Sequence, residues 1–299
     1  MRYFVIRTEN LTKYYGRRLG IEDLTIEVEP GEVYGFLGPD NAGKTTTVRL
    51  LLDTIRPTHG RALVLGMDCQ KQAKEIRLQA GFLPEEFSLF NHMSVADFLR
   101  YLSRQRSQAS LAYGTSLSEQ FGLNLGRRIV TLSALEKRQL GIVQAFLHHP
   151  DLLILDEPTK GLDRNSASLF YRLVSEARAD GRSVFLTSKS LLEMERICDR
   201  VAILHAGKLI AVERGVQLRS RAVRRIEMRF ADPVQLDDFR SVPNIDDLRL
   251  EDNKVFCIVH GEPDCLIKVA SRHRVTDFIS QQISLEEAFS AYYGIGQYN

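Results

Sequence analysis

Before residue 215, short apolar runs alternate with longer stretches in which apolar residues recur at helical spacing. Residues 152–155 form a continuous run, Leu-Leu-Ile-Leu, which is typical of a strand buried on both faces of a parallel sheet. Val48, Leu51, Leu52 and Ile55 fall at positions i, i+3, i+4 and i+7, which indicates one face of a helix. Repeated alternation of such segments predicts an α/β fold.

The same patterns place most of the other elements. Strands are expected at 3–11, 21–28, 32–37, 60–65, 80–84, 152–155, 184–187, 201–204 and 209–212. Helices are expected at 48–56, 70–79, 166–179 and 191–198, and another follows Ser94, a predicted N-cap. Residues 104–116 are polar and are expected to form an exposed, irregular connection. Two further helices are expected to begin near 116 and 133.

The pattern changes after residue 215. Strands are expected at 226–230, 248–250, 255–259 and 275–280, with helices at 233–240 and 264–271. Strand, helix, strand, strand, helix, strand is the order of a split βαβ unit. Residues 284–287, Ser-Leu-Glu-Glu, form a capping box that predicts a final helix. The chain therefore divides into domains at 1–215 and 216–299.

Composition narrows the class of protein. The 299 residues are 44% hydrophobic and 26% charged, as in an ordinary globular protein. A net charge of +2 gives no electrostatic reason to expect nucleic acid as a partner. Four scattered cysteines suggest neither a zinc site nor a disulfide framework, so a reducing compartment is expected. No run of about 18 apolar residues could span a membrane, so any membrane role must come through a partner.

The first candidate site follows the predicted strand 32–37. Residues 38–45 fit the phosphate-binding template G-x-x-x-x-G-K-[ST] and precede a helix, as that template requires. Backbone N–H groups and the helix N-terminus would converge on phosphate. Lys44 would reach the outer phosphates of ATP, and the Thr45 hydroxyl would ligate Mg²⁺. The expected phosphate-binding residues are Gly38, Pro39, Asp40, Asn41, Ala42, Gly43, Lys44, Thr45 and Thr46.

A second candidate site follows the apolar run 152–155. Ligands of parallel sheets bind at the carboxyl ends of the strands, and Asp156 and Glu157 lie there. Asp156 is placed to hold Mg²⁺, and Glu157 is placed to deprotonate an attacking water. Tyr15, upstream of the phosphate loop, could stack on a nucleotide base, although an aromatic residue beside a strand is more often part of the core.

The order of these motifs resembles that of the ATP-binding subunits of ABC transporters, most closely the ABC-2 exporter class, over nearly the whole chain. Residues 161–163, Gly-Leu-Asp, match the family loop that crosses between subunits, and 132–136 occupy the signature position. The resemblance implies a P-loop ATPase domain with a helical subdomain at about 86–150 that contacts a separate membrane-spanning permease. It also implies an accessory C-terminal α+β domain and a location on the cytoplasmic face of the cell membrane.

The same resemblance implies a head-to-tail homodimer or heterodimer. Two ATP molecules would lie between one chain's phosphate loop and the other chain's signature, where Ser133 remains to donate a hydrogen bond. The residues expected to act in hydrolysis are then Lys44, Glu157 and Lys189, and those near the metal are Thr45, Glu85 and Asp156.

Four motifs depart from the family pattern. Asp40 and Asn41 replace Asn-Gly in the loop, and Glu85 replaces a glutamine that touches Mg²⁺. Leu135 replaces the second signature glycine and would crowd the γ-phosphate across the dimer. Lys189 replaces the switch histidine, and its ammonium donates hydrogen bonds but cannot accept them.

These departures lead to the hypothesis that ATP binding survives and turnover is slow, and that histidine at 189 would raise the rate. The expected function is to power export through a permease. One alternative is a non-hydrolysing, ATP-gated regulatory subunit, and another is a soluble ABC protein that acts on nucleic acid or ribosomes.

Overall fold

The computed structural model describes residues 3–86, 92–104, 108–215 and 223–282. Contacts within the chain divide it into two units, Met1–Glu213 and Arg214–Asn299. The predicted final helix at 284–287 lies outside the described residues. Each unit has its own sheet and core, so each is described by itself.

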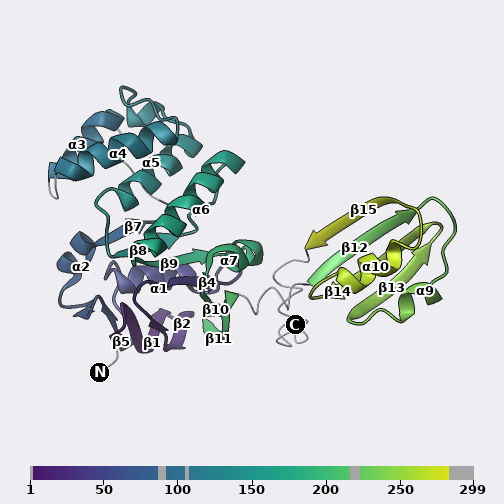
Figure 1. The fold of residues 1–299 in the computed structure, drawn as a ribbon. Helices are drawn as coiled ribbons and strands as arrows, with labels where there is room; N and C mark the ends of the chain where they lie inside the picture. The colour runs from purple at the N-terminus through teal and green to yellow at the C-terminus, as the bar shows by residue number, and fades with distance from the viewer. Residues whose placement is uncertain (1–2, 87–91, 105–107, 216–222, 283–299) are drawn as a thin grey trace. The chain divides into compact units, whose positions relative to one another are not determined.

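A six-stranded sheet forms the centre of the first unit, in the order β11-β10-β4-β9-β8-β7 (Figure 1). The bounds are β4 (Val33–Leu37), β7 (Ala80–Leu83), β8 (Leu152–Asp156), β9 (Ser183–Ser188), β10 (Arg200–His205) and β11 (Lys208–Arg214). The pairs from β10 through β7 are parallel. Every residue of β4, β8 and β9 is buried, which is why apolar residues make up most of each strand, as in the run at 152–155.

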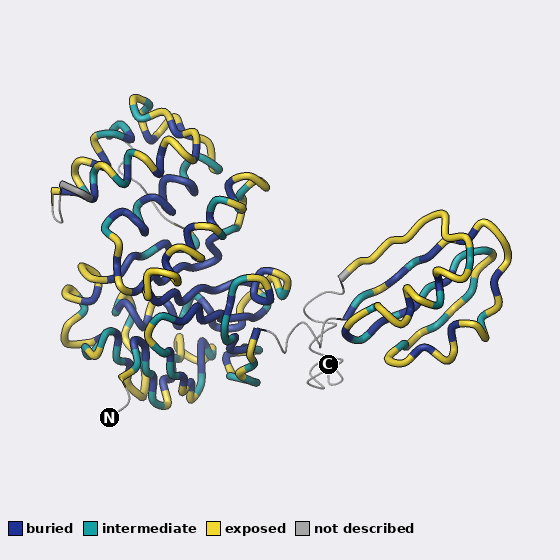
Figure 2. The backbone as a smooth tube through the Cα atoms, viewed as in Figure 1, coloured by how far each residue is buried: buried dark blue, intermediate teal, exposed yellow. Residues whose placement is uncertain are grey.

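A second, antiparallel sheet has the order β2-β1-β5-β6, with β3 paired to β1. Its strands are β1 (Ile6–Tyr15), β2 (Arg18–Leu24), β3 (Glu27–Val28), β5 (His59–Val64) and β6 (Met67–Asp68). The expectation that strand 1 ends near residue 11 was wrong, because Lys13, Tyr14 and Tyr15 continue the pairing with β2 through register shifts. Helix α1 (Lys44–Leu51) shares one buried core with both sheets (Figure 2).

The remaining helices of the first unit are α2 (Ala73–Gln79), α3 (Val95–Arg104), α4 (Gln108–Gln120), α5 (Ala134–Phe146), α6 (Arg164–Ala179) and α7 (Leu191–Ile197). In Figure 1, α3, α4 and α5 form a group at the end of the sheet where β7 lies. Ser94 and Ser133 accept hydrogen bonds from the N–H groups of Asp97 and Glu136, as expected of N-caps.

The prediction of an irregular connection at 104–116 was wrong, because α4 occupies residues 108–120. The buried side of α4 includes Ser110, Gly114 and Ser118, which are small and polar or lack a side chain. A Cβ on Gly114 would lie 2.2 Å from Leu147 Cδ1, so a larger residue there would require the Leu147 side chain to move. Tertiary packing therefore overrides a local sequence that looks like a loop.

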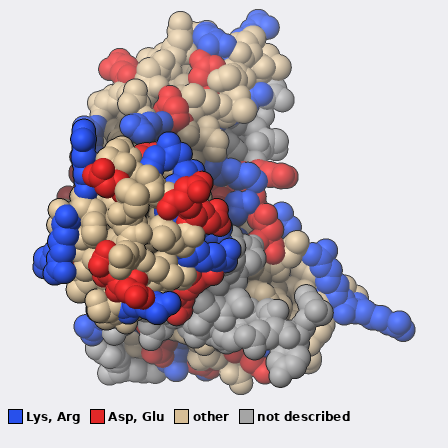
Figure 3. Space-filling model, turned by 90° about the vertical axis from the view of Figure 1, so that its right-hand side faces the viewer, with Lys and Arg blue, Asp and Glu red and all other residues tan. Residues whose placement is uncertain are grey.

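The second unit contains β12 (Val223–Phe230), α9 (Asp237–Arg240), β13 (Ile245–Glu251), β14 (Lys254–His260), α10 (Asp264–Ala270) and β15 (Val275–Gln282). Its sheet has the order β13-β14-β12-β15 with antiparallel neighbours, which confirms the predicted split βαβ order. Met228, Phe239 and Leu266 lie in its core. Positive and negative side chains are intermingled on the face drawn in Figure 3.

Candidate functional site

A pocket of about 680 Å³ lies where the phosphate loop, the ends of β8 and β9 and the start of α1 come together. Its described lining is Tyr15, Arg18, Leu19, Gly20, Asp40, Asn41, Ala42, Gly43, Lys44, Thr45, Thr46, Arg49, Glu85, Glu157, Lys160 and Lys189. Most of the predicted nucleotide-contacting residues are therefore brought together. Asp156 supports the site from the end of β8, and Ser133 is not part of the lining.

Two residues of the loop between β4 and α1 adopt the left-handed backbone conformation, and both are of types that tolerate it. Asn41 has φ 63°, which asparagine tolerates better than most residues, and Gly43 has φ 104°. A Cβ on Gly43 would lie 2.5 Å from Ile21 Cγ2 and 2.7 Å from the Gly20 carbonyl, so only glycine fits. Lys44 folds back over the loop, and its Nζ donates to the carbonyls of Gly38 at 2.7 Å and Pro39 at 3.0 Å.

The two acidic residues after β8 have different surroundings. Glu157 Oε1 lies 3.2 Å from Lys44 Nζ, and both side chains are nearly buried. Asp156 accepts a hydrogen bond from the Thr187 hydroxyl at 2.6 Å, and burial raises the pKa of its carboxyl. The same Thr187 oxygen accepts from the Glu157 N–H at 3.0 Å, so one side chain on β9 fixes both acidic residues.

Oxygen ligands suited to Mg²⁺ converge beside α1. The Thr45 hydroxyl donates to Glu85 Oε2 at 3.3 Å, and its proximity to Asp156 lowers the pKa of that carboxyl against the larger, raising effect of burial. A hydroxyl and two carboxylates are hard oxygen donors, which is the set that Mg²⁺ prefers. Lys160 Nζ lies 2.7 Å from Glu85 Oε1, and this hydrogen bond lowers the pKa of the Glu85 carboxyl. Glu85 is therefore kept anionic at the place where a metal would bind.

Lys189 follows β9 and lies against the phosphate loop. Its Nζ is 3.3 Å and 3.2 Å from the two carboxylate oxygens of Asp40. The hydrogen bond from Lys189 lowers the pKa of Asp40. Two positions that depart from the family pattern thus contact each other.

Arg138 was missed by the sequence-based predictions, although it holds the site together. From α5, its buried guanidinium donates to the carbonyls of five residues at or just after the ends of β7 and β8: Pro84, Glu85, Asp156, Glu157 and Pro158. It thereby ties the segment that carries Glu85 to the segment that carries Asp156 and Glu157. Flanking residues Lys137 and Gln139 are equally polar, so the sequence alone has no signal that singles out Arg138.

Tyr15 and Ser133 lie at the margins of this arrangement. Tyr15 lines the pocket with its ring 42% exposed and its hydroxyl 3.5 Å from Thr46 Oγ1. A half-exposed ring at the rim is available for stacking, unlike a core aromatic. Ser133 caps α5 in a capping box with Glu136, away from this pocket.

A phosphate loop with its lysine, next to a strand that ends in two carboxylates, defines the class of P-loop ATPases. The family model described as ABC transporter matches residues 21–160. The chain is 35% identical over 231 residues to the bacitracin transport ATP-binding protein BcrA of Bacillus licheniformis, covering 76% of each chain. It is 32% identical over 294 residues to the Nod factor export ATP-binding protein I of Rhizobium meliloti, covering 95% of this chain and 86% of the relative.

Solved structures agree in fold. An ATP-binding subunit of an ABC transporter matches with a TM-score of 0.67 and 28% identity, over 70% of this chain and 90% of that one. A dimeric bacterial ABC transporter cassette matches with a TM-score of 0.64 at 19% identity, over 70% and 98%. The chain belongs to the family of ABC transporter ATP-binding subunits, which confirms the expected α/β P-loop fold and implies that the chain binds ATP. None of the described helices combines the length and apolar character needed to cross a bilayer.

Proposed function

We propose that this chain binds ATP with Mg²⁺ in the pocket beside α1 and powers export through a separate membrane-spanning permease. The observation that carries the proposal is the convergence of Lys44, Thr45, Glu85 and Glu157 on one pocket, with Asp156 held at the end of β8 by Thr187. Export is supported by relatives whose names refer to bacitracin transport and Nod factor export. The chain would act at the cytoplasmic face of the membrane through its permease.

In this proposal the phosphates of ATP lie against the loop backbone and Lys44. Thr45, Asp156 and Glu85 would hold Mg²⁺, which would supply positive charge to neutralise the phosphates. Phosphate oxygens compete with Glu157 for the Lys44 ammonium, 3.2 Å away in the structure, so nucleotide binding frees the Glu157 carboxylate. Glu157 then accepts a proton from a water molecule while the oxygen of that water attacks the γ-phosphorus. The bond between the γ-phosphorus and the oxygen that bridges it to the β-phosphate breaks, and ADP leaves with that oxygen.

A head-to-tail dimer would complete the site. Ser133 lies outside this chain's own pocket, at the exposed start of α5, where it can serve a partner's pocket. Leu135 lies in the first turn of the same helix, partly exposed, and would approach the nucleotide with Ser133. Turnover is then slower than in relatives with glycine at that position. Co-purification distinguishes the two kinds of dimer: a homodimer yields this chain alone, and a heterodimer yields a second ATP-binding subunit with it.

Steady-state phosphate release by the purified chain tests hydrolysis. We expect measurable turnover that is lost in Glu157→Gln, because general-base catalysis contributes about 10²–10⁴-fold. ATP affinity should be unchanged within about threefold, since the amide keeps the shape of the side chain. Wild-type turnover as fast as that of ordinary family members would refute the proposed effect of Leu135 and Lys189.

The non-hydrolysing regulatory subunit is the second candidate, and Leu135 with Lys189 favours it. Trapping of ADP with vanadate separates the two candidates, because only a hydrolysing subunit forms the trapped state. Membrane extracts in which a permease co-purifies with the chain would support both candidates against a soluble role on ribosomes.

A further inference from the structure

Asp40 and Lys189 form an ion pair across two neighbouring strands of the central sheet. β4 and β9 run parallel with Leu37 opposite Ser188, so the residues that follow them lie at the same edge. Lys189 comes directly after β9, and Asp40 lies in the loop that follows β4. Both carboxylate oxygens of Asp40 are within 3.3 Å of Lys189 Nζ, and both residues line the pocket.

The charge on Asp40 is unfavourable for a phosphate ligand. The backbone of its loop is the surface expected to hold the phosphates, and a carboxylate there adds a negative charge beside an anion. Lys189 supplies the opposite charge. A lysine ammonium has three donors, and the two oxygens of Asp40 account for two, which leaves one for a phosphate oxygen.

We infer that Asp40 and Lys189 are a compensating pair: Lys189 neutralises Asp40 so that the loop accepts a nucleotide, and Asp40 positions the ammonium at the pocket rim. The inference rests on the proposed function, because it takes ATP to be the ligand. It changes what is expected of single substitutions. Lys189→His at neutral pH leaves the carboxylate of Asp40 largely unneutralised, so histidine at 189 improves the site only when Asp40 is replaced as well.

A double-mutant cycle on the full-length chain tests the pair. Dissociation constants for ATP are measured by equilibrium dialysis in EDTA at about 50 mM salt for wild type, Asp40→Asn, Lys189→Met and the double variant. Lys189→Met should weaken ATP binding about three- to tenfold, since the pair is largely exposed to water. The double variant should return to within about twofold of wild type, and Lys189→Arg should bind as wild type does.

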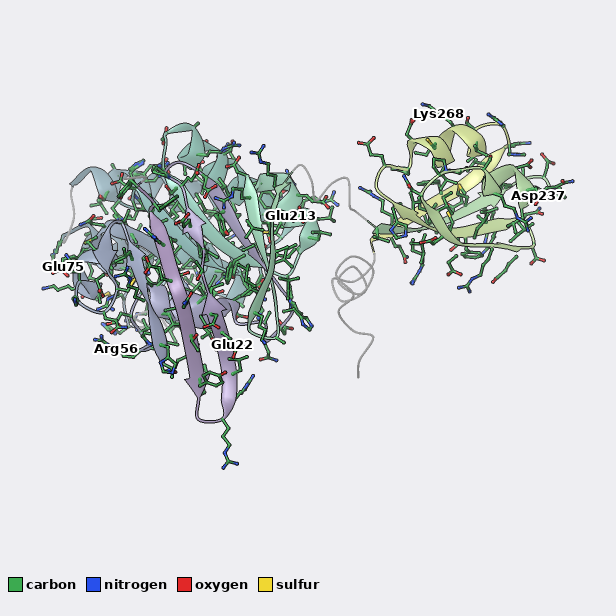
Figure 4. All side chains as sticks on the ribbon, turned by 90° about the horizontal axis from the view of Figure 1, so that it is seen from below. Glu22, Arg56, Glu75, Glu213, Asp237 and Lys268 are labelled. Carbon is green, nitrogen blue, oxygen red and sulfur yellow. The ribbon has the colours of Figure 1, made fainter. Side chains whose placement is uncertain are left out.

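Two further measurements separate an electrostatic role from a structural one. The loss in Lys189→Met should shrink toward zero at about 1 M salt, where charges are screened within roughly 3 Å. Thermal unfolding checks that each variant is folded. Lys268→Met is the matched control, because Lys268, labelled in Figure 4, forms an exposed ion pair with Asp264 at 2.6 Å on α10 of the other unit. It should leave ATP binding unchanged.

The outcomes are distinct. If wild type binds ATP and the double variant binds as weakly as Lys189→Met, the pair is not compensating and the inference is overturned. A loss in Lys189→Met that persists at high salt also overturns it. If folded wild type does not bind ATP, the proposed function is wrong. This outcome is visible in the wild-type measurement alone, before any variant is compared.

Discussion

Replacing Arg138 should uncouple the two halves of the nucleotide site. The guanidinium reaches the carbonyls of Pro84 at 2.7 Å, Glu85 at 3.1 Å, Asp156 at 2.8 Å and Pro158 at 3.2 Å, and it also contacts that of Glu157. These carbonyls belong to segments that are far apart in the sequence. In Arg138→Met the side chain keeps most of its volume and loses every donor.

The size of the effect follows from burial. Arg138 is 6% exposed, so water cannot replace its hydrogen bonds without entering the core. A hydrogen bond to a charged group contributes about 1.5–3 kcal/mol, and such contributions within one network do not add. A buried acceptor that loses its donor costs about 1–3 kcal/mol, and Arg138→Met strands several carbonyls at once, so we expect it to lose about 3–5 kcal/mol of unfolding free energy. Arg138→Lys keeps the charge but cannot span the carbonyls, so its loss should be about 2 kcal/mol.

Urea unfolding followed by far-ultraviolet circular dichroism measures the loss, with the transition of residues 1–213 fitted separately from that of the second unit. Arg172→Met is the matched control, because Arg172 is 57% exposed and should lose less than about 1 kcal/mol. ATP turnover of folded Arg138→Met should fall at least tenfold, since Glu85 and Glu157 lose their common support. A variant within 1 kcal/mol of wild type, or one that is destabilised yet fully active, would refute this reasoning.

Three further predictions concern other parts of the first unit. Lys160→Met should move the titration midpoint of the Glu85 carboxyl, followed by carbon-13 NMR, up toward 4.5, because the hydrogen bond from Lys160 lowers that pKa. Since the folded-state pKa of Glu85 is depressed, the Lys160–Glu85 pair stabilises the protein above pH 4.5, and this contribution is lost as the pH falls through the folded-state pKa. A Glu85 midpoint unchanged by the substitution would contradict the role given to Lys160. Gly114→Val should reduce stability by about 2 kcal/mol in urea unfolding, because a Cβ there meets Leu147, whereas a neutral result would mean that α4 can shift. Gly43→Ala should abolish ATP binding in dialysis while the chain stays folded, since a Cβ would meet the Gly20 carbonyl, and retained binding would show that the loop can adjust.

Sequence patterns predicted the central sheet well for a physical reason. Strands such as β8 are buried on both faces, so their residues are mostly apolar, and a short apolar run at 152–155 has few other structures available. The hydrophobicity pattern did not predict the first part of helix α4. Its buried side includes Ser110, Gly114 and Ser118, which pack by being small rather than by being apolar, beside a single-residue apolar signal at Leu117. A hydrophobicity pattern carries no trace of close packing of that kind.

Some parts of the candidate site could be predicted from the sequence and others could not. The phosphate loop and Asp156-Glu157 could be predicted, because each is a local motif whose place after a strand already fixes its direction. Arg138 and Lys160 could not, because their roles are contacts between segments remote in sequence. Lys189 was expected beside a phosphate, but its contact with Asp40 depends on β4 and β9 being neighbours, which the order of elements along the chain does not specify.

The pocket carries its own counter-ions. Each lysine in its described lining, Lys44, Lys160 and Lys189, contacts a carboxylate: Glu157, Glu85 and Asp40 respectively. A site with three bare ammonium groups would collect any small anion in the cell, inorganic phosphate above all. Here an anion that approaches any of the three lysines must compete with a tethered carboxylate, which a single weak contact does not displace. A triphosphate can replace several of these carboxylates as lysine partners at once. The pocket therefore discriminates between ligands by the number of negative charges that each presents together.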